Sequence, residues 1–156
     1  MATPEALRSS SPGDAAFLVR NADTGLLVAK NLEIAATRAA RRRGLLGRER
    51  LAPGDALWIV PSRGVHTCGM RFAIDVVALD ARGVVVDVVT DLRPWRLRLP
   101  RFGTLGVLEL PAGTVRASRI AVGHRISFER VGAASLAGRG ATAGTEGLPP
   151  ITGMAS

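Results

Sequence analysis

The chain has 156 residues, 47% of them hydrophobic, which is enough for one core of ordinary domain size but not for two. Its formal charge of +8 comes from 21 basic and 13 acidic residues, and because every basic residue except Lys30 is arginine, which a coding bias also favours, the charge argues only weakly for an anionic partner. The single cysteine, Cys68, excludes an internal disulfide and leaves a structural zinc site short of thiolates, so we expect a cytoplasmic protein.

Neither export nor membrane insertion is expected from the apolar segments. Residues 1–20 lack the continuous apolar stretch of a secretory signal, and the apolar stretch 83–89 contains Asp87 and is far shorter than a membrane span. Residues 1–20 and 132–156 consist mainly of small, polar and turn-forming residues. We therefore predict a disordered N-terminal tail, a single β-rich domain over residues 21–131, and a disordered Gly/Ala-rich C-terminal tail over residues 132–156.

The first elements of the domain are a short strand and a helix. Residues 25–29 have the composition of a strand, and Thr37 can cap a helix over residues 38–43 that Gly44 ends. The arginines at 41–43 would lie at the C-terminus of this helix, where the macrodipole favours positive charge. That position accounts for them without a binding role.

Strands account for most of the remaining domain. A buried strand is predicted at 56–60, and the apolar runs 70–79 and 84–90 predict a hairpin whose turn uses Gly83. Further strands are predicted at residues 104–110, 116–121 and 124–128. The expected fold is mostly β, of the α+β class: a small compact barrel or rolled antiparallel sheet with one short helix packed on it.

A series of motifs resembles a known family in both content and order. The motifs are AAT at 35–37 with Arg41, GLLGR at 44–48, VHTCGMRFAIDVVALD at 65–80, GVV at 83–85, LRPW at 92–95 and VLELPAG at 107–113. Together they resemble the domain of unknown function 192 family over roughly residues 27–128, in the branch common in high-GC bacteria. This resemblance implies a small β-rich fold, no established reaction and no known cofactor. Ala73 and His124 depart from the family pattern, which often has proline and usually aspartate there, so no role of that aspartate is transferred.

Residues 65–75 contain the largest concentration of side chains that could bind a metal or take part in catalysis. If this segment is extended, His66, Cys68 and Met70 share one face, with Phe72 and Ile74. These ligand types suit Cu(I), but alternate residues of a flat strand lie about 6 to 7 Å apart and do not converge on one ion. We therefore expect no metal and no cofactor, and we interpret Cys68 as a small buried thiol rather than a nucleophile activated by His66.

Charged residues inside the apolar strands provide the main functional candidates. Asp75 follows Ile74 within an apolar run and must reach solvent or find a partner, for which Arg71 or Arg48 could serve. One interpretation is an ion pair that stabilises the fold. The other is a polar patch in a cleft that binds a small anion or a peptide end.

Residues 92–102 interleave four arginines with Trp95 and Phe102, as a loop that binds single-stranded nucleic acid would. No nucleic-acid fold signature accompanies them. The same residues describe an edge strand kept soluble by arginine, with Trp95 closing the core.

We predict a non-enzymatic, monomeric accessory module that binds a small anionic ligand or a protein. Its expected patch consists of His66, Thr67, Arg71, Asp75 and Trp95, supported by Arg48 and Glu109. One alternative is a small enzyme that uses Asp75 or Glu109 with His66 as acid or base, and another, not favoured, is a basic nucleic-acid-binding protein. An enzyme should gather these groups in a concave pocket with a desolvated carboxylate of raised pKa, whereas a binding or structural set leaves them scattered or neutralised.

Overall fold

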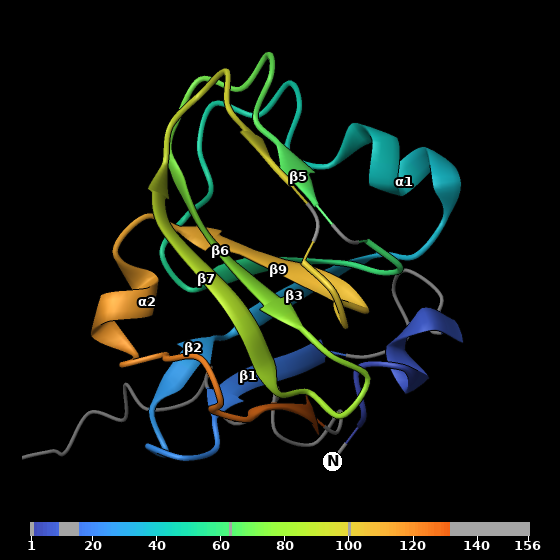
Figure 1. Ribbon diagram of the computed structural model, residues 1–156, viewed down its shortest axis with the longest axis vertical. Helices are drawn as coiled ribbons and strands as arrows, with labels where there is room; N and C mark the ends of the chain where they lie inside the picture. Colours follow the sequence, from blue (N-terminus) through green and yellow to red (C-terminus); the bar gives the residue numbers. More distant parts are fainter. Residues whose placement is uncertain (1, 10–15, 63, 100, 132–156) are drawn as a thin grey trace, which may run out of the picture.

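The computed structural model describes residues 2–9, 16–62, 64–99 and 101–131 (Figure 1). The elements of this part of the chain are η1 (Ala6–Ser9), β1 (Ala16–Asn21), β2 (Leu27–Ala29), β3 (Asn31–Ala35), α1 (Arg38–Arg43), β4 (Asp55–Ile59), β5 (Val65–His66), β6 (Ile74–Leu79), β7 (Val85–Leu92), β8 (Leu97–Arg98), β9 (Gly106–Pro111), α2 (Thr114–Ala117) and β10 (Ile126–Val131). Neither α1 nor α2 is long and apolar enough to cross a membrane.

The strands form three sheets, in the orders β3-β4-β9-β6-β7, β10-β1-β2 and β5-β8. Neighbouring strands are antiparallel except β3 and β4, which run parallel because α1 and the loop after it return the chain between them. The mostly β, α+β prediction is confirmed. The barrel alternative is not, because each of these orders is open within the described residues.

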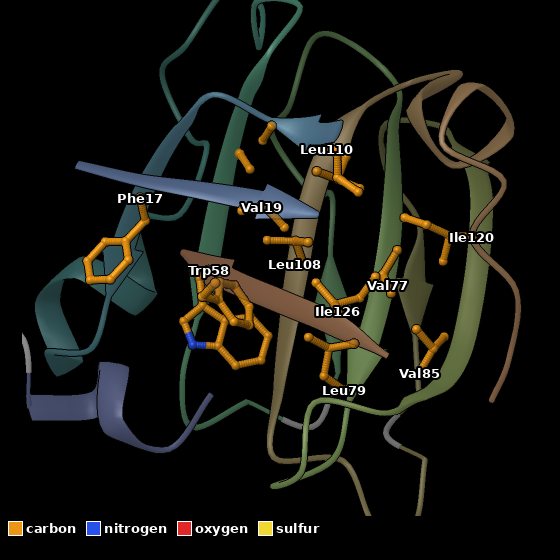
Figure 2. Packing of buried hydrophobic residues seen from close by; sticks show 14 of the residues in the cluster. Phe17, Val19, Trp58, Val77, Leu79, Val85, Leu108, Leu110, Ile120 and Ile126 are labelled. Carbon is orange, nitrogen blue, oxygen red and sulfur yellow. The ribbon is translucent and has the colours of Figure 1, made fainter. Parts of the chain in front are cut away.

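The five-stranded sheet is covered on both faces. On one face it packs against β1 and β10. Figure 2 shows Val19, Leu79 and Leu108 in the shared apolar cluster, which we call the first core. Trp58 of β4 is fully buried there. Gly106 allows this packing, since a Cβ at that position would lie 2.7 Å from Cη2 of Trp58.

The second face is covered by the segment from α1 to Leu51 and by the two-stranded β5-β8 ribbon (Figure 1). Residues of this cover and of the sheet form a second apolar cluster, which we call the second core. It includes Leu45, Val65 and Met70 from the cover and Val76 and Val107 from the sheet. Glu109 lies on the same face, because it pairs directly with Val76. A carboxyl group is therefore buried between the sheet and its cover.

Local signals in the sequence predict several elements correctly. The Thr37 hydroxyl accepts a hydrogen bond from the Ala40 amide at 3.1 Å, and Gly44 follows the helix with φ of 48°, as expected for α1. The hairpin of β6 and β7 is confirmed, and Gly83 has φ of 82° at its turn. The strands predicted near 25–29, 56–60, 104–110 and 124–128 correspond to β2, β4, β9 and β10.

The predicted strand over residues 116–121 is wrong. The chain instead forms α2, because the Val115 amide donates to Asp75 across the fold and Gly113 takes a left-handed conformation with φ of 90°. The described residues thus form two short α-helices where one was expected, and α2 is held by an interaction with a residue 40 positions away.

The N-terminal boundary also differs from the prediction. The expected tail over residues 1–20 includes most of β1, whose Ala16 to Asn21 pair with β10, and Leu7 is buried in the first core. The strand β3 was not expected either. The predicted C-terminal tail, residues 132–156, lies outside the described residues.

Residues 66–75 are not one extended strand, so the alternation expected for them does not hold. The ribbon strand β5 ends at His66, a turn with Gly69 at φ of 82° follows, and β6 begins only at Ile74. The prediction that Trp95 closes the core is also wrong. Its side chain is exposed, and Trp58 is the buried tryptophan.

Candidate functional site

A cavity of about 170 Å³ lies between the end of α1, the segment after β4, the β5-β8 ribbon and β9. The side chains that matter for its chemistry are Glu109, His66, Ser62, Met70, Leu46 and Arg43. Its wall is formed partly by the C-terminal residues of α1, which the Thr37 cap and Gly44 position. The cavity is smaller than the roughly 300 Å³ at which pockets for drug-sized ligands begin, so it suits a small group.

Glu109 is the only acidic residue among those that line this cavity. Its side chain is 4% exposed, and its Oε2 atom is buried with no hydrogen-bond partner. Burial raises the pKa of Glu109 from 4.5 to about 7, although the positive charge of Arg48 acts to lower it. Near neutral pH the carboxyl is therefore about half protonated and can donate or accept a hydrogen bond.

Arg48 is engaged elsewhere. Its Nη2 atom lies 2.6 Å from Oε2 of Glu33, an exposed residue of β3. The guanidinium therefore acts on Glu109 through space, with no hydrogen bond between the two. This leaves the buried carboxyl with a nearby positive charge and an unused acceptor.

Asp75 lies on the opposite face of the five-stranded sheet from Glu109. It pairs directly with Leu110 of the first core, whereas Glu109 pairs with Val76 of the second. Its two carboxylate oxygens accept hydrogen bonds from the Asp91 and Val115 amides, each at 2.9 Å. Asp75 is thus partnered by main-chain amides that hold β7 and α2, rather than by the ion pair with Arg71 or Arg48 considered above.

Thr67 is also buried, and it ties the β5-β8 ribbon together. Its hydroxyl donates to the Arg93 carbonyl at 2.6 Å and accepts from the Arg96 amide at 2.9 Å. Its carbonyl accepts from the Trp95 amide at 3.0 Å. Thr67 therefore positions the ribbon whose β5 strand forms part of the cavity.

The residues of the expected patch do not all lie together in the structure. Only His66 and Glu109 line the cavity, Arg48 acts on it electrostatically, and Thr67 supports its wall. Asp75 is on the other face of the sheet, while Arg71 and Trp95 are exposed and outside this cavity. Cys68 is exposed rather than buried, and no group of three possible metal-ligating His, Cys, Asp or Glu side chains occurs within the described ranges.

The contribution of the α1 C-terminus and of Ser62 to this cavity was not predicted from the sequence. The arginines at 41–43 border the cavity, yet their position at a helix end gave a sufficient structural reason for them. Ser62 also borders it, and its hydroxyl donates to the Gly64 carbonyl at 2.9 Å. No catalytic motif surrounds this serine, so only its place in the fold identifies it.

Comparisons with known proteins agree with the motif resemblance. Residues 19–128 match the family model of DUF192, described as an uncharacterized ACR. A UPF0127 protein of Pyrococcus abyssi is 37% identical over 82 residues, which are 49% of this chain and 69% of that protein. A UPF0127 protein of Thermococcus sibiricus is 31% identical over 117 residues, covering 70% and 73% of the two chains.

The fold is also similar to that of a solved structure from Sinorhizobium meliloti, named as a candidate transcription regulator. The TM-score is 0.65 at 20% identity, over 77% of this chain and 97% of the other. At this identity the likeness concerns the fold alone.

We predict that Asp75→Asn lowers the free energy of unfolding by roughly 2 to 4 kcal/mol, because the amide retains only one acceptor oxygen for two main-chain donors, of which the Val115 amide is buried. Urea unfolding monitored by circular dichroism measures this loss. Asp91→Asn is the matched control, since its carboxylate is exposed and makes only a 3.8 Å contact with Arg93. Equal stability of the two variants would contradict the anchoring role of Asp75.

We predict that protonation of Glu109 stabilises the fold. Because its pKa rises from 4.5 unfolded to about 7 folded, the free energy of unfolding should fall by about 3 kcal/mol as pH rises through this range. Below about pH 4.5 the carboxyl is neutral in both states and has no such effect. Glu109→Gln should remove this loss and exceed wild type in stability above about pH 7.

Urea unfolding across this pH range, with the exposed Glu49→Gln as control, provides the measurement. The control should follow the wild-type profile. If Glu109→Gln followed it as well, the buried carboxyl would not be protonated on folding as described.

Proposed function

The chain belongs to the DUF192 family, and we propose that this member is a non-enzymatic accessory module that binds a small anion in the Glu109 cavity. The observation that carries the proposal is the buried Glu109 carboxyl, whose Oε2 atom has no partner within the protein. Buried polar groups are nearly always hydrogen-bonded, so an unpartnered one beside a cavity is a reason to expect a ligand there.

The charges around the cavity favour an anion. Three arginines at 41–43 border it, and the positive charge of Arg48 acts on the Glu109 carboxyl. Glu109 is the only acidic residue among those that line the cavity. In its neutral form, Glu109 can donate its proton to an anionic oxygen. Bound anion should therefore raise the pKa of Glu109 further, and binding should take up a proton at neutral pH.

We expect acetate, oxalate or inorganic phosphate, used as probes, to raise the thermal unfolding temperature of the full chain. Because binding requires the neutral acid, affinity should fall up to about tenfold per pH unit above about pH 7. Glu109→Gln keeps a neutral donor, so its binding should persist without this pH dependence. His66→Ala should weaken binding, whereas Arg71→Ala, which alters an exposed residue outside the cavity, should not.

Two outcomes would contradict this proposal. Affinity for these anions that stays constant or rises as Glu109 ionises would show that the neutral acid is not required for binding. Equal losses in Arg71→Ala and His66→Ala would indicate general charge attraction rather than this cavity.

A second candidate, a small acid-base enzyme, is favoured by one specific observation. Glu109 combines burial, a pKa near 7 and a place in the same concave cavity as His66, which is the arrangement expected of a general acid or base. However, the Ser62 hydroxyl donates to the Gly64 carbonyl rather than to His66, so His66 does not activate this serine as a nucleophile.

If this second candidate is correct, p-nitrophenyl acetate or p-nitrophenyl phosphate should be turned over with a pH-rate limb near 7. The activity should be lost in Glu109→Gln and retained in Arg71→Ala. Turnover no faster than the buffer, or equal turnover in Glu109→Gln, would exclude a catalytic Glu109 with these substrates.

A further inference from the structure

The most exposed apolar residues of the described chain follow one another along the β8 segment. Trp95, Leu97 and Leu99 are each 69% exposed, and Phe102 is fully exposed at 102%. We call these four residues the Trp95 row. Single exposed apolar residues are normal on a protein surface, but four large ones within eight positions are typical of an interaction site.

The ribbon that carries the row is well fixed. Arg98 points inward from β8, and its guanidinium donates to the largely buried carboxylate of Asp87 on β7, with Nε at 3.1 Å from Oδ2. Thr67 holds the Trp95 end through the hydrogen bonds described above. Because strand neighbours alternate, this inward position of Arg98 places Leu97 on the outer side.

Trp95 adds evidence that this exposure is specific. Its backbone has φ of 61°, in the left-handed region that is unfavourable for a non-glycine residue. The Thr67 carbonyl holds it there by accepting from its amide. The fold thus maintains an unfavourable backbone conformation at the exposed tryptophan.

The charge beside the row is positive. Arg93, Arg96 and Arg101 are exposed, and the only acidic residue in the segment 92–102 or adjoining it is Asp91, which lies 3.8 Å from Arg93. Asp87, the other nearby acid, is already paired with Arg98 and lies 3.6 Å from Arg101. The partner of this surface should therefore combine negative charge with a region that accepts apolar side chains.

We propose that the Trp95 row and its flanking arginines dock the protein on a membrane surface that contains anionic lipid. Tryptophan and phenylalanine side chains suit the boundary between headgroups and acyl chains, leucines enter it, and arginines bind lipid phosphates and carboxylates. Single-stranded nucleic acid fits less well, because Leu97 and Leu99 occupy the middle of the row and cannot stack on bases as aromatic side chains do.

The first test is sedimentation of the full chain with vesicles. It should bind mixed phosphatidylcholine and phosphatidylserine vesicles, bind pure phosphatidylcholine vesicles much more weakly, and be released by added salt. The intrinsic fluorescence should shift to the blue on binding. Trp58 is fully buried and Trp95 is exposed, so this shift reports on Trp95.

Two variants and a control separate the apolar and charged contributions. Leu97→Ser with Leu99→Ser should abolish vesicle binding without lowering the thermal unfolding temperature, because both side chains are exposed and the Arg98 to Asp87 contact remains. Arg93→Gln with Arg96→Gln should remove the preference for phosphatidylserine. Val122→Ser, which alters an exposed apolar residue on the turn before β10, should bind as wild type.

Three outcomes would overturn the proposal. The first is the absence of binding to phosphatidylserine vesicles, or equal binding by the leucine variant. The second is binding of oligothymidylate, but not of vesicles, that the leucine variant loses. The third is a dimer in solution that the leucine variant dissociates, again without vesicle binding, which would make the row a contact between copies of the chain.

Discussion

The pairing register of β6 and β9 decides which polar side chains of this protein can act together. Asp75 stands opposite Leu110, and Val76 stands opposite Glu109. Because successive side chains of a strand point to opposite faces, this register places one carboxyl in each of the two cores of the five-stranded sheet. A shift by one residue would turn the side chains of one strand to the other face and place both carboxyls in the same core, so the site depends on the register before it depends on any single side chain.

The two buried carboxyl groups meet the cost of burial differently. Asp75 keeps both oxygens hydrogen-bonded to main-chain amides, so it joins β7 and α2 to the sheet. Glu109 receives no such bonds at Oε2 and shifts toward its neutral form instead. A fully partnered buried group supports a structure, whereas a partly partnered one beside a cavity can respond to a ligand.

Elements determined by nearby residues could be predicted from the sequence. The Thr37 cap, the turn glycine Gly83 and the apolar runs of β6 and β7 act over a few positions, and each prediction was confirmed. The segment 116–121 was misjudged because α2 depends on Asp75, which is distant in sequence. Burial is equally non-local, and composition alone could not tell which of Trp58 and Trp95 lies in the core.

The candidate site was only partly predictable for the same reason. His66 and Glu109 were identified by their residue types, but the assumption of one extended segment placed Asp75 and Arg71 with them. The turn at Gly69 breaks that segment, and the reversal brings Met70 under the ribbon while Arg71 stays exposed. The arginines at 41–43 have an adequate local explanation at the helix end, which concealed their place beside the cavity.

The β5-β8 ribbon takes part in both proposed functions. Val65 pairs with Arg98 on the inner side, where one is buried in the second core and the other binds Asp87. His66 pairs with Leu97, so a residue that lines the cavity lies next to the Trp95 row. Because the ribbon is held by its inner contacts and by Thr67, the outer leucines contribute little to the cavity wall. The two surfaces are therefore adjacent in space and both depend on Thr67, but Leu97 and Leu99 do not line the cavity and can be altered without changing it.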